Sequence, residues 1–179
     1  WKRQGRPSAS NVRLMETLRL VTTGQRHTKM FNPTFGLQKI TKNWYLSKDG
    51  DTYARSLFKK HYSYRAYKDG RTPKLFVGPG QKMVLVMEGG LFVWRKYISN
   101  QEGINCAVFR NETKLKSSEL ILEAELASNI KWEHPIRLFT FVNKSKVKSK
   151  NAGDCFKKAG WKTCGITKWN KLIILEKFI

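Results

Sequence analysis

Acidic residues and cysteines are both scarce in this sequence. Thirteen Asp and Glu stand against 35 Lys and Arg, which gives a formal net charge of +22. A charge of this size says little about the fold, but it predicts affinity for polyanions. The alternative is a basic surface that serves solubility alone. The three cysteines show no Cys-x-x-Cys spacing, which argues against a disulfide framework or a cysteine zinc site and is typical of reduced thiols.

Several other signals are missing. No apolar run approaches 18 residues, so we expect no membrane span, and no signal-like apolar region follows Trp1, so we expect a cytoplasmic protein. The hydrolase motifs G-x-S-x-G and H-E-x-x-H and the P-loop are absent. His27 and His134 have no acids or cysteines at zinc-ligand spacing. What remains is a chain of 179 residues with 40% hydrophobic content, enough for one domain with a substantial core.

The charge pattern divides the chain into an arm and a domain. Through Lys48 there are ten Lys and Arg and a single acid, Glu16. We predict a basic N-terminal arm over residues 1–42, partly helical or extended, and one domain over residues 43–179. The arm either follows a phosphate backbone or is a flexible basic tail.

Hydrophobic runs and turn signals predict the order β-α-β-β-β-α-β-α-β-β within the domain. The three strands in the middle form an antiparallel meander whose apolar runs are nearly continuous, which indicates burial on both faces. Asp51-Thr52 is expected to cap the first helix, and Ser117 or Ser118 is the expected N-cap of the long helix. Leu120 and Ala124 belong to the apolar face of the long helix. The order predicts an α/β (α+β) domain with a mixed sheet and helices on its faces. The expected strands cover 43–46, 83–87, 91–98, 104–109, 138–142, a segment from residue 161 and 172–175. The expected helices cover 52–61 and 117–130, and residues 151–153 lead into a short third helix that ends at 160.

This order resembles that of the GNAT acyltransferase superfamily. The local match is Phe-Val-Asn at 141–143, followed by the short helical segment 153–160 that ends in Ala-Gly before Trp161. The resemblance implies a central, mostly antiparallel sheet whose fourth and fifth strands splay apart, with helices on both faces. It also implies acyl-CoA bound between those strands, with its pyrophosphate at the start of the long helix.

The matching positions define candidate cofactor residues. They are Arg110, Ser117 and Ser118, and the alternative is an ordinary surface charge beside an ordinary helix cap. The usual Gly-rich pyrophosphate loop is absent here. Phe156 stands where many of these enzymes carry a Tyr that protonates the leaving thiolate, and the neighbouring Cys155 is either a weak donor or an inert buried thiol.

Within that superfamily, the sequence is similar to the phage Mom-type DNA-modification proteins. The similarity lies in His61-Tyr62-Ser63 after the first helix and in the serine-containing start of the long helix. It implies transfer of a small glycinamide-type group to adenine N6, which protects phage DNA from restriction in the bacterial cytoplasm. His61, Tyr62 and Ser118 are then the candidate catalytic residues, and iron would bind near His61 and Tyr62. Asn143 replaces the acid expected after the fifth strand. The alternative is that His61 and Tyr62 merely end a helix.

Basic residues are concentrated near the end of the chain. Residues 143–171 contain nine Lys and one acid, whereas residues 102–133 contain six acids and four Lys or Arg. In an extended loop, the alternating lysines would lie on one face and contact phosphates. Arg65 and the tyrosines around His61 would stack on bases. The alternative is a solvated surface loop. The candidate phosphate-binding residues are Lys144, Lys146, Lys148 and Lys150, and the expected partner is double-stranded DNA, with no membrane.

The favoured hypothesis is therefore an acyl-type transferase that acts on a DNA base amine. A backbone N–H near 106–109 would stabilise the oxyanion. Two other hypotheses stay open: a GNAT-type transferase acting on tRNA or protein amines, and a non-catalytic basic protein that binds nucleic acid on the same fold.

Overall fold

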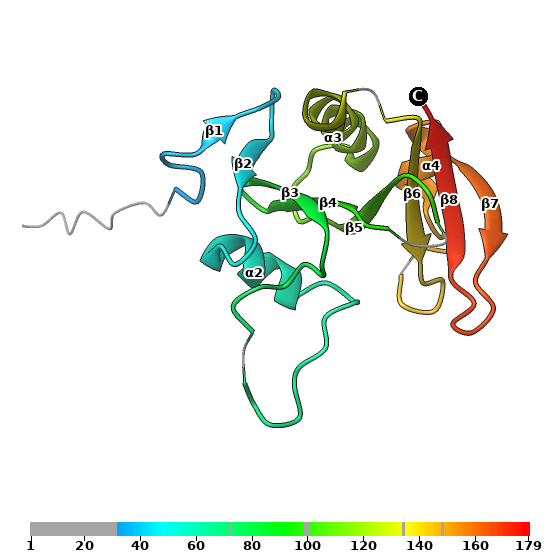
Figure 1. The fold of residues 1–179 in the computed structure, drawn as a ribbon, viewed down its shortest axis with the longest axis horizontal. Coiled ribbons are helices and arrows are strands. Elements are labelled where there is room, and N and C mark those ends of the chain that lie inside the picture. Colours follow the sequence, from blue (N-terminus) through cyan, green and yellow to red (C-terminus); the bar gives the residue numbers. More distant parts are fainter. Residues whose placement is uncertain (1–31, 72, 99–100, 134, 148) are drawn as a thin grey trace, which may run out of the picture. The chain divides into compact units, whose positions relative to one another are not determined.

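A computed structural model of the chain describes residues 32–71, 73–98, 101–133, 135–147 and 149–179. These residues form one open, mixed, mostly antiparallel sheet of eight strands in the order β1-β2-β3-β4-β5-β6-β8-β7, together with three helices in the described part (Figure 1). The strands are β1 (Gln38–Lys39), β2 (Tyr45–Ser47), β3 (Gln81–Met87), β4 (Gly90–Lys96), β5 (Ile104–Asn111), β6 (Arg137–Val142), β7 (Lys162–Ile166) and β8 (Ile173–Phe178). The helices are α2 (Thr52–Lys59), α3 (Ser117–Trp132) and α4 (Asp154–Lys158).

The predicted element order is confirmed, with one addition at its start. β1, which the sequence placed in the arm, pairs antiparallel with β2. Residues 1–31 of the predicted arm lie outside the described residues, so the arm's proposed contact with a phosphate backbone stays a prediction. No helix in the described ranges is long and apolar enough to cross a membrane.

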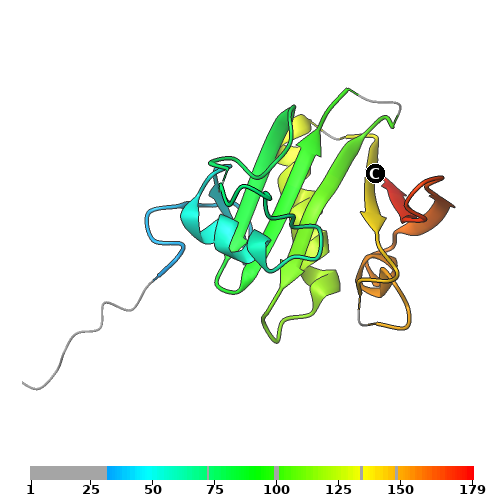
Figure 2. The same ribbon diagram turned by 90° about the horizontal axis from the view of Figure 1, so that it is seen from below.

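The meander of β3, β4 and β5 is buried on both faces, as predicted. Leu85 and Phe92 pack against the residues of α3 and α4, on what we call the α3 face. Val86 and Val93 pack against α2, on the α2 face. Figure 2 shows α2 in front of the meander and α3 behind it. Burial on both faces explains why these strands read as continuous apolar runs.

A β-bulge interrupts the pairing of β4 with β5. Val93 lies opposite Val108 and Trp94 lies opposite Cys106, so Ala107 has no paired residue on β4. A bulge of this kind changes the alternation of side chains along the strand. Ala107 and Val108 therefore both face α2.

β6 pairs with β5 over a short distance and then leaves it. The parallel pairing covers Ile104 to Cys106 on β5 and Leu138 to Thr140 on β6. Beyond it, β6 runs apart from β5 (Figure 2) while keeping its full antiparallel pairing with β8. The expected parting of these two strands is therefore present, and it begins at the bulge.

Helix starts follow the sequence at α2 but not at α3. The Asp51 carboxylate accepts a hydrogen bond from the Ala54 N–H at 2.8 Å, the predicted cap. The prediction of a serine cap on α3 is wrong, because the N-cap is Lys116 and makes no side-chain cap bond. The Asn111 side chain organises the preceding turn instead and donates to the Ser117 hydroxyl oxygen at 3.1 Å. Ser117 is thereby already inside the helix.

Two acids of α3 connect the helix to both ends of the sheet. Glu123 accepts hydrogen bonds from Asn43 at 2.9 Å (backbone N–H) and 2.6 Å (side chain), just before β2. Glu125 is buried and accepts from the indole N–H of Trp161 at 2.6 Å and from the Lys177 ammonium at 2.6 Å. These contacts attach α3 to the segment before β2 and to the segment from α4 to β8.

The segment around α4 forms as predicted. Gly153 has a left-handed backbone (φ 77°) immediately before the helix, and a Cβ there would collide with Leu175 of β8. Phe156 and Trp161 are buried and contact each other edge to face, at 5.0 Å between ring centroids. Together they fill the α3 face beneath β6.

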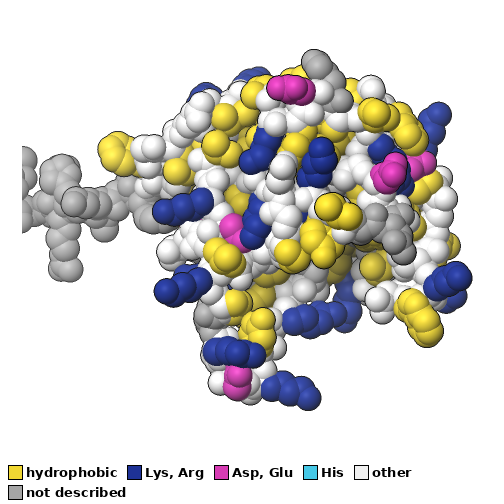
Figure 3. Space-filling model, in the orientation of Figure 1, with side chains coloured by type: hydrophobic (Ala, Val, Ile, Leu, Met, Phe, Trp, Pro, Cys, Tyr) yellow, Lys and Arg dark blue, Asp and Glu magenta, His cyan; other side chains and the backbone are white. Residues whose placement is uncertain are grey.

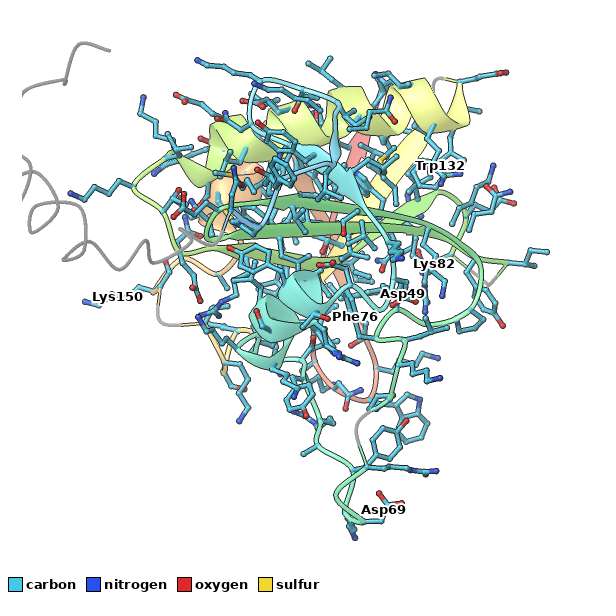
Figure 4. All side chains as sticks on the ribbon, turned by 90° about the vertical axis from the view of Figure 1, so that its left-hand side faces the viewer. Asp49, Asp69, Phe76, Lys82, Trp132 and Lys150 are labelled. Carbon is cyan, nitrogen blue, oxygen red and sulfur yellow. The ribbon has the colours of Figure 1, made fainter. Side chains whose placement is uncertain are left out.

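The long segment between α2 and β3 is fixed at its far end by Asp49. Its carboxylate accepts from the backbone N–H of Phe76 at 2.8 Å and forms an ion pair with Lys82 at 2.7 Å (Figure 4). The other end of the segment begins at the last turn of α2. Both ends are therefore held, and the residues directly after α2 keep a defined position beside the sheet.

We expect Glu125→Gln to lower the free energy of unfolding by about 3 kcal/mol, because Lys177 would be left without its counter-ion in a largely buried place. The matched control is Glu119→Gln, which removes a solvent-exposed ion pair with Lys116 and should cost less than about 0.5 kcal/mol. Urea unfolding followed by circular dichroism measures both. Equal effects in the two variants would contradict the structural role given to Glu125.

Candidate active site

His61 lies just after α2 and is held by its neighbour. Its backbone N–H donates to the Phe58 carbonyl at 2.9 Å. The ring atom Nδ1 accepts from the Ser63 backbone N–H at 3.2 Å and lies 2.7 Å from the Ser63 hydroxyl. Nδ1 is thus the acceptor nitrogen of a neutral ring, and Nε2 carries the proton. Burial, helped by the nearby charge of Arg110, lowers the pKa of His61 to about 4.

Tyr62 reaches from this segment to the end of β6. Its hydroxyl donates to the Phe141 carbonyl at 3.3 Å, and its ring centroid lies 4.3 Å from that of His61. Burial raises the pKa of Tyr62, and the Asn143 backbone N–H, which hydrogen-bonds the phenolic oxygen, opposes that rise. The phenol therefore keeps its proton at neutral pH.

Two cavities meet at these residues. One, of about 120 Å³, lies on the α3 face, where Cys106, Phe109, Cys155 and Phe156 contribute to its wall. The other, of about 330 Å³, lies on the α2 face between the segment after α2 and the β7–β8 hairpin. We call them the α3-side cavity and the α2-side cavity. Both are lined by His61, Tyr62, Ala107 and Phe141.

The cysteines of the α3-side cavity are poor nucleophiles. Burial raises the pKa of Cys106 well above its ordinary value, and it also raises the pKa of Cys155. A thiol reacts as its thiolate, so both side chains behave at neutral pH as small apolar groups. The interpretation of Cys155 as an inert thiol agrees with this environment.

Of the predicted cofactor residues, Arg110 lies near His61 but does not line the cavities, and the two serines lie on α3. The Arg110 guanidinium forms an ion pair with Glu112 at 2.7 Å and donates to the Lys60 carbonyl at 2.6 Å. Ser117 and Ser118 occupy the first turn of α3. None of the three lines either cavity. The structure thus brings His61 and Tyr62 together and leaves Ser118 at a separate place.

The predicted extended lysine loop is a turn. Lys146 N–H donates to the Asn143 carbonyl at 3.1 Å, and the Asn143 side chain accepts from the Ser145 N–H at 3.0 Å. A turn does not place alternate residues on one face. Lys144, Lys146 and Lys150 are each exposed, and Lys148 lies outside the described residues.

The α2-side cavity has a wall that the sequence did not indicate. Arg65, a predicted nucleic-acid contact, does line it, together with Asn143. Asn170 and Leu172 come from the β7–β8 hairpin. The sequence predicts that hairpin, but nothing in it says that the hairpin reaches the segment after α2, because that proximity depends on where β6 places its partner β8.

The residues present do not suit iron. The described ranges hold no group of three or more His, Cys, Asp and Glu close enough to bind a metal ion. The His61 Nδ1 atom is taken by Ser63 and the Tyr62 oxygen by the end of β6. The narrow, mostly apolar α3-side cavity suits the thin arm of a thioester better than it suits a metal ion.

We expect stability to fall by about 2 kcal/mol between pH 7 and pH 5 on account of His61 alone. The pKa of His61 is about 4 when folded and 6.5 when unfolded, so the unfolded chain binds the proton first and gains from acidification. The stability present above pH 6.5 is therefore lost progressively as the pH falls toward 4. Urea unfolding of the protein and of His61→Gln across this range isolates the contribution. An NMR titration that places His61 near 6.5 would contradict it.

In comparisons with known proteins, no protein-family model and no curated protein sequence matches this chain. The geometry of the parted strands and of the two cavities is therefore the basis on which a function is proposed.

Proposed function

We propose that the chain is a GNAT-like transferase that moves a small acyl-type group onto the amine of a nucleic-acid base, with adenine N6 in DNA as the favoured acceptor. The observation that carries this proposal is the meeting of two cavities, one from each face of the sheet, at His61 and Tyr62. A transferase must hold two reactants in contact while each enters separately. The parted strands provide that arrangement.

The topology supports the same proposal. From β2 onward, the strand order and the departure of the fifth strand of that series from the fourth resemble the arrangement expected of the GNAT superfamily. In such a fold the activated acyl group lies between the parted strands. The α3-side cavity is the matching place here, and acyl-CoA is one donor class whose arm it would hold.

Tyr62 is suited to donate a proton where Phe156 cannot. Both side chains line the α3-side cavity, and the raised pKa of Tyr62 keeps its hydroxyl protonated. In the proposed reaction the base nitrogen forms a bond to the acyl carbon, and the bond between that carbon and the leaving group breaks. The Tyr62 proton passes to the leaving group, and the attacking nitrogen returns a proton to Tyr62.

His61 and the bulge would stabilise the developing oxyanion. The neutral His61 ring carries its proton on Nε2, and within the described residues no hydrogen bond uses that atom. The backbone of Ala107 lies at the bulge, where the regular ladder is interrupted beside the opening between the strands. Donors preorganised at such a place stabilise the negative charge that forms on the acyl oxygen.

The surface supports a nucleic acid as the acceptor. Arg65 lines the α2-side cavity, and Lys144 and Lys146 are exposed in the turn after β6. Figure 3 shows Lys and Arg side chains spread over the visible face with few acids among them. Arg65 and these exposed lysines would attract a polyanion to the rim of the α2-side cavity and the turn after β6.

We expect cells that express the protein to contain a modified DNA nucleoside, and Tyr62→Phe to reduce its amount about 100-fold through loss of the proton donor. Mass spectrometry of digested DNA and RNA measures both. The control is Tyr67→Phe, which removes a hydroxyl from a half-exposed ring that lines neither cavity. Modified tRNA in place of DNA would move the acceptor to RNA, and unmodified spectra would contradict the transferase proposal.

A second candidate is a non-catalytic nucleic-acid-binding protein on the same fold. The observation that favours it is that His61 and Tyr62 both hold structural partners, Ser63 and the Phe141 carbonyl. In that case His61 and Tyr62 variants that fold normally would keep every biological effect. Loss of Lys144 and Lys146 would abolish it.

A further inference from the structure

Trp169 is almost fully exposed at the tip of the β7–β8 hairpin. Its side chain is 93% exposed. The other tryptophans of the described residues are at least partly buried, and each donates its indole N–H to a partner. Trp44 donates to the Leu120 carbonyl and Trp94 to the Ala124 carbonyl. Trp132 donates to the Gln81 side chain, and Trp161 donates to the Glu125 carboxylate. Within the described residues, the Trp169 indole has neither this burial nor a hydrogen bond of this kind.

The hairpin holds this side chain in a defined place. Thr167 N–H donates to the Leu172 carbonyl at 2.9 Å, and Leu172 N–H donates to the Thr167 hydroxyl at 2.9 Å. These bonds close the turn on both sides of Lys168 to Lys171. A large ring projecting from a closed turn can enter another structure without unfolding its own.

The hairpin tip is also the rim of the α2-side cavity. Asn170 and Leu172 line that cavity, so Trp169 stands next in sequence to one of its walls. Lys168 and Lys171 flank the ring, and both are exposed. An aromatic ring with a cation on either side suits a stack of bases whose phosphates lie alongside.

We propose that Trp169 is a wedge that enters a nucleic-acid duplex and takes the place of the target base while that base turns into the α2-side cavity. This inference rests on the proposed function and specifies its substrate as duplex DNA. An enzyme that acts on a base amine must remove the base from the stack, at a cost of a few kcal/mol in stacking and pairing. An apolar side chain inserted into the gap offsets part of that cost. A single strand needs no such wedge.

The experiment uses a short DNA duplex in which one 2-aminopurine replaces the target adenine, with no acyl donor present. The fluorescence of 2-aminopurine rises when the base leaves the stack. We expect the full chain to produce that rise and Trp169→Ala to reduce the flipped fraction about tenfold, with Trp169→Phe in between. The same oligonucleotide as a single strand should bind both proteins alike. The control is Phe35→Ala, which removes an 87% exposed ring that lines neither cavity.

Three outcomes would overturn the inference. They are duplex binding without unstacking, equal unstacking by Trp169→Ala, and an equal loss of single-strand and duplex binding in that variant. The last would make Trp169 a general stacking surface. Because no donor is used, a Trp169-dependent rise in a protein that modifies no DNA would leave this inference standing while the transferase proposal fails. Modified DNA with no dependence on Trp169 would do the reverse.

Discussion

The departure of β6 from β5 is the constraint on which the rest of the structure depends. The two strands pair only from Ile104 to Cys106 on β5, so few backbone hydrogen bonds join β6, β8 and β7 to the meander. Other contacts must hold this half of the sheet in place. Glu125 on α3 contacts Trp161 and Lys177. Arg137 of β6 donates to the Glu102 carbonyl at 2.6 Å, and Tyr62 donates to the Phe141 carbonyl. Side chains thus replace the missing part of the ladder.

The same contacts define the site. Tyr62 connects the segment after α2 to the end of β6, and its side chain lines both cavities. Its hydrogen bond to the Phe141 carbonyl is long, 3.3 Å, and weak by the usual criteria. The cost of burying His61 in its neutral form is a loss of stability as the pH falls below 6.5, because the unfolded chain binds the proton first. The apolar core on both faces of the meander offsets that loss of stability.

The sequence predicted the elements well because each carries a local signal. Continuous apolar runs marked the meander, Asp51 capped α2, and Gly153 with Gly160 bounded α4. It failed where a side chain overrides local preference. The Asn111 side chain organises the turn before α3, so the N-cap lies one residue before the first serine expected to cap the helix. The Asn143 side chain folds the lysine loop into a turn. The positions of His61 and Tyr62 at a helix end were predictable, but the bulge was not, since the register of β5 against β4 depends on packing across the sheet and not on the residues of β5 alone. The same holds for the hairpin wall of the α2-side cavity.

The two cavities differ in a way that bears on which reactant enters from which face. The α3-side cavity holds about 120 Å³ and is lined by Phe156 of α4, so it has room only for a small group. The α2-side cavity holds about 330 Å³ and lies among the segment after α2, Asn143 and the β7–β8 hairpin. A nucleic-acid base is bulkier than a small acyl-type group, so the larger cavity fits the base better. If the chain joins a small group to a nucleic acid, this difference in volume favours an approach of the polymer from the α2 face. That face carries Arg65 and borders the exposed lysines after β6, so the charge lies on the side that the geometry favours.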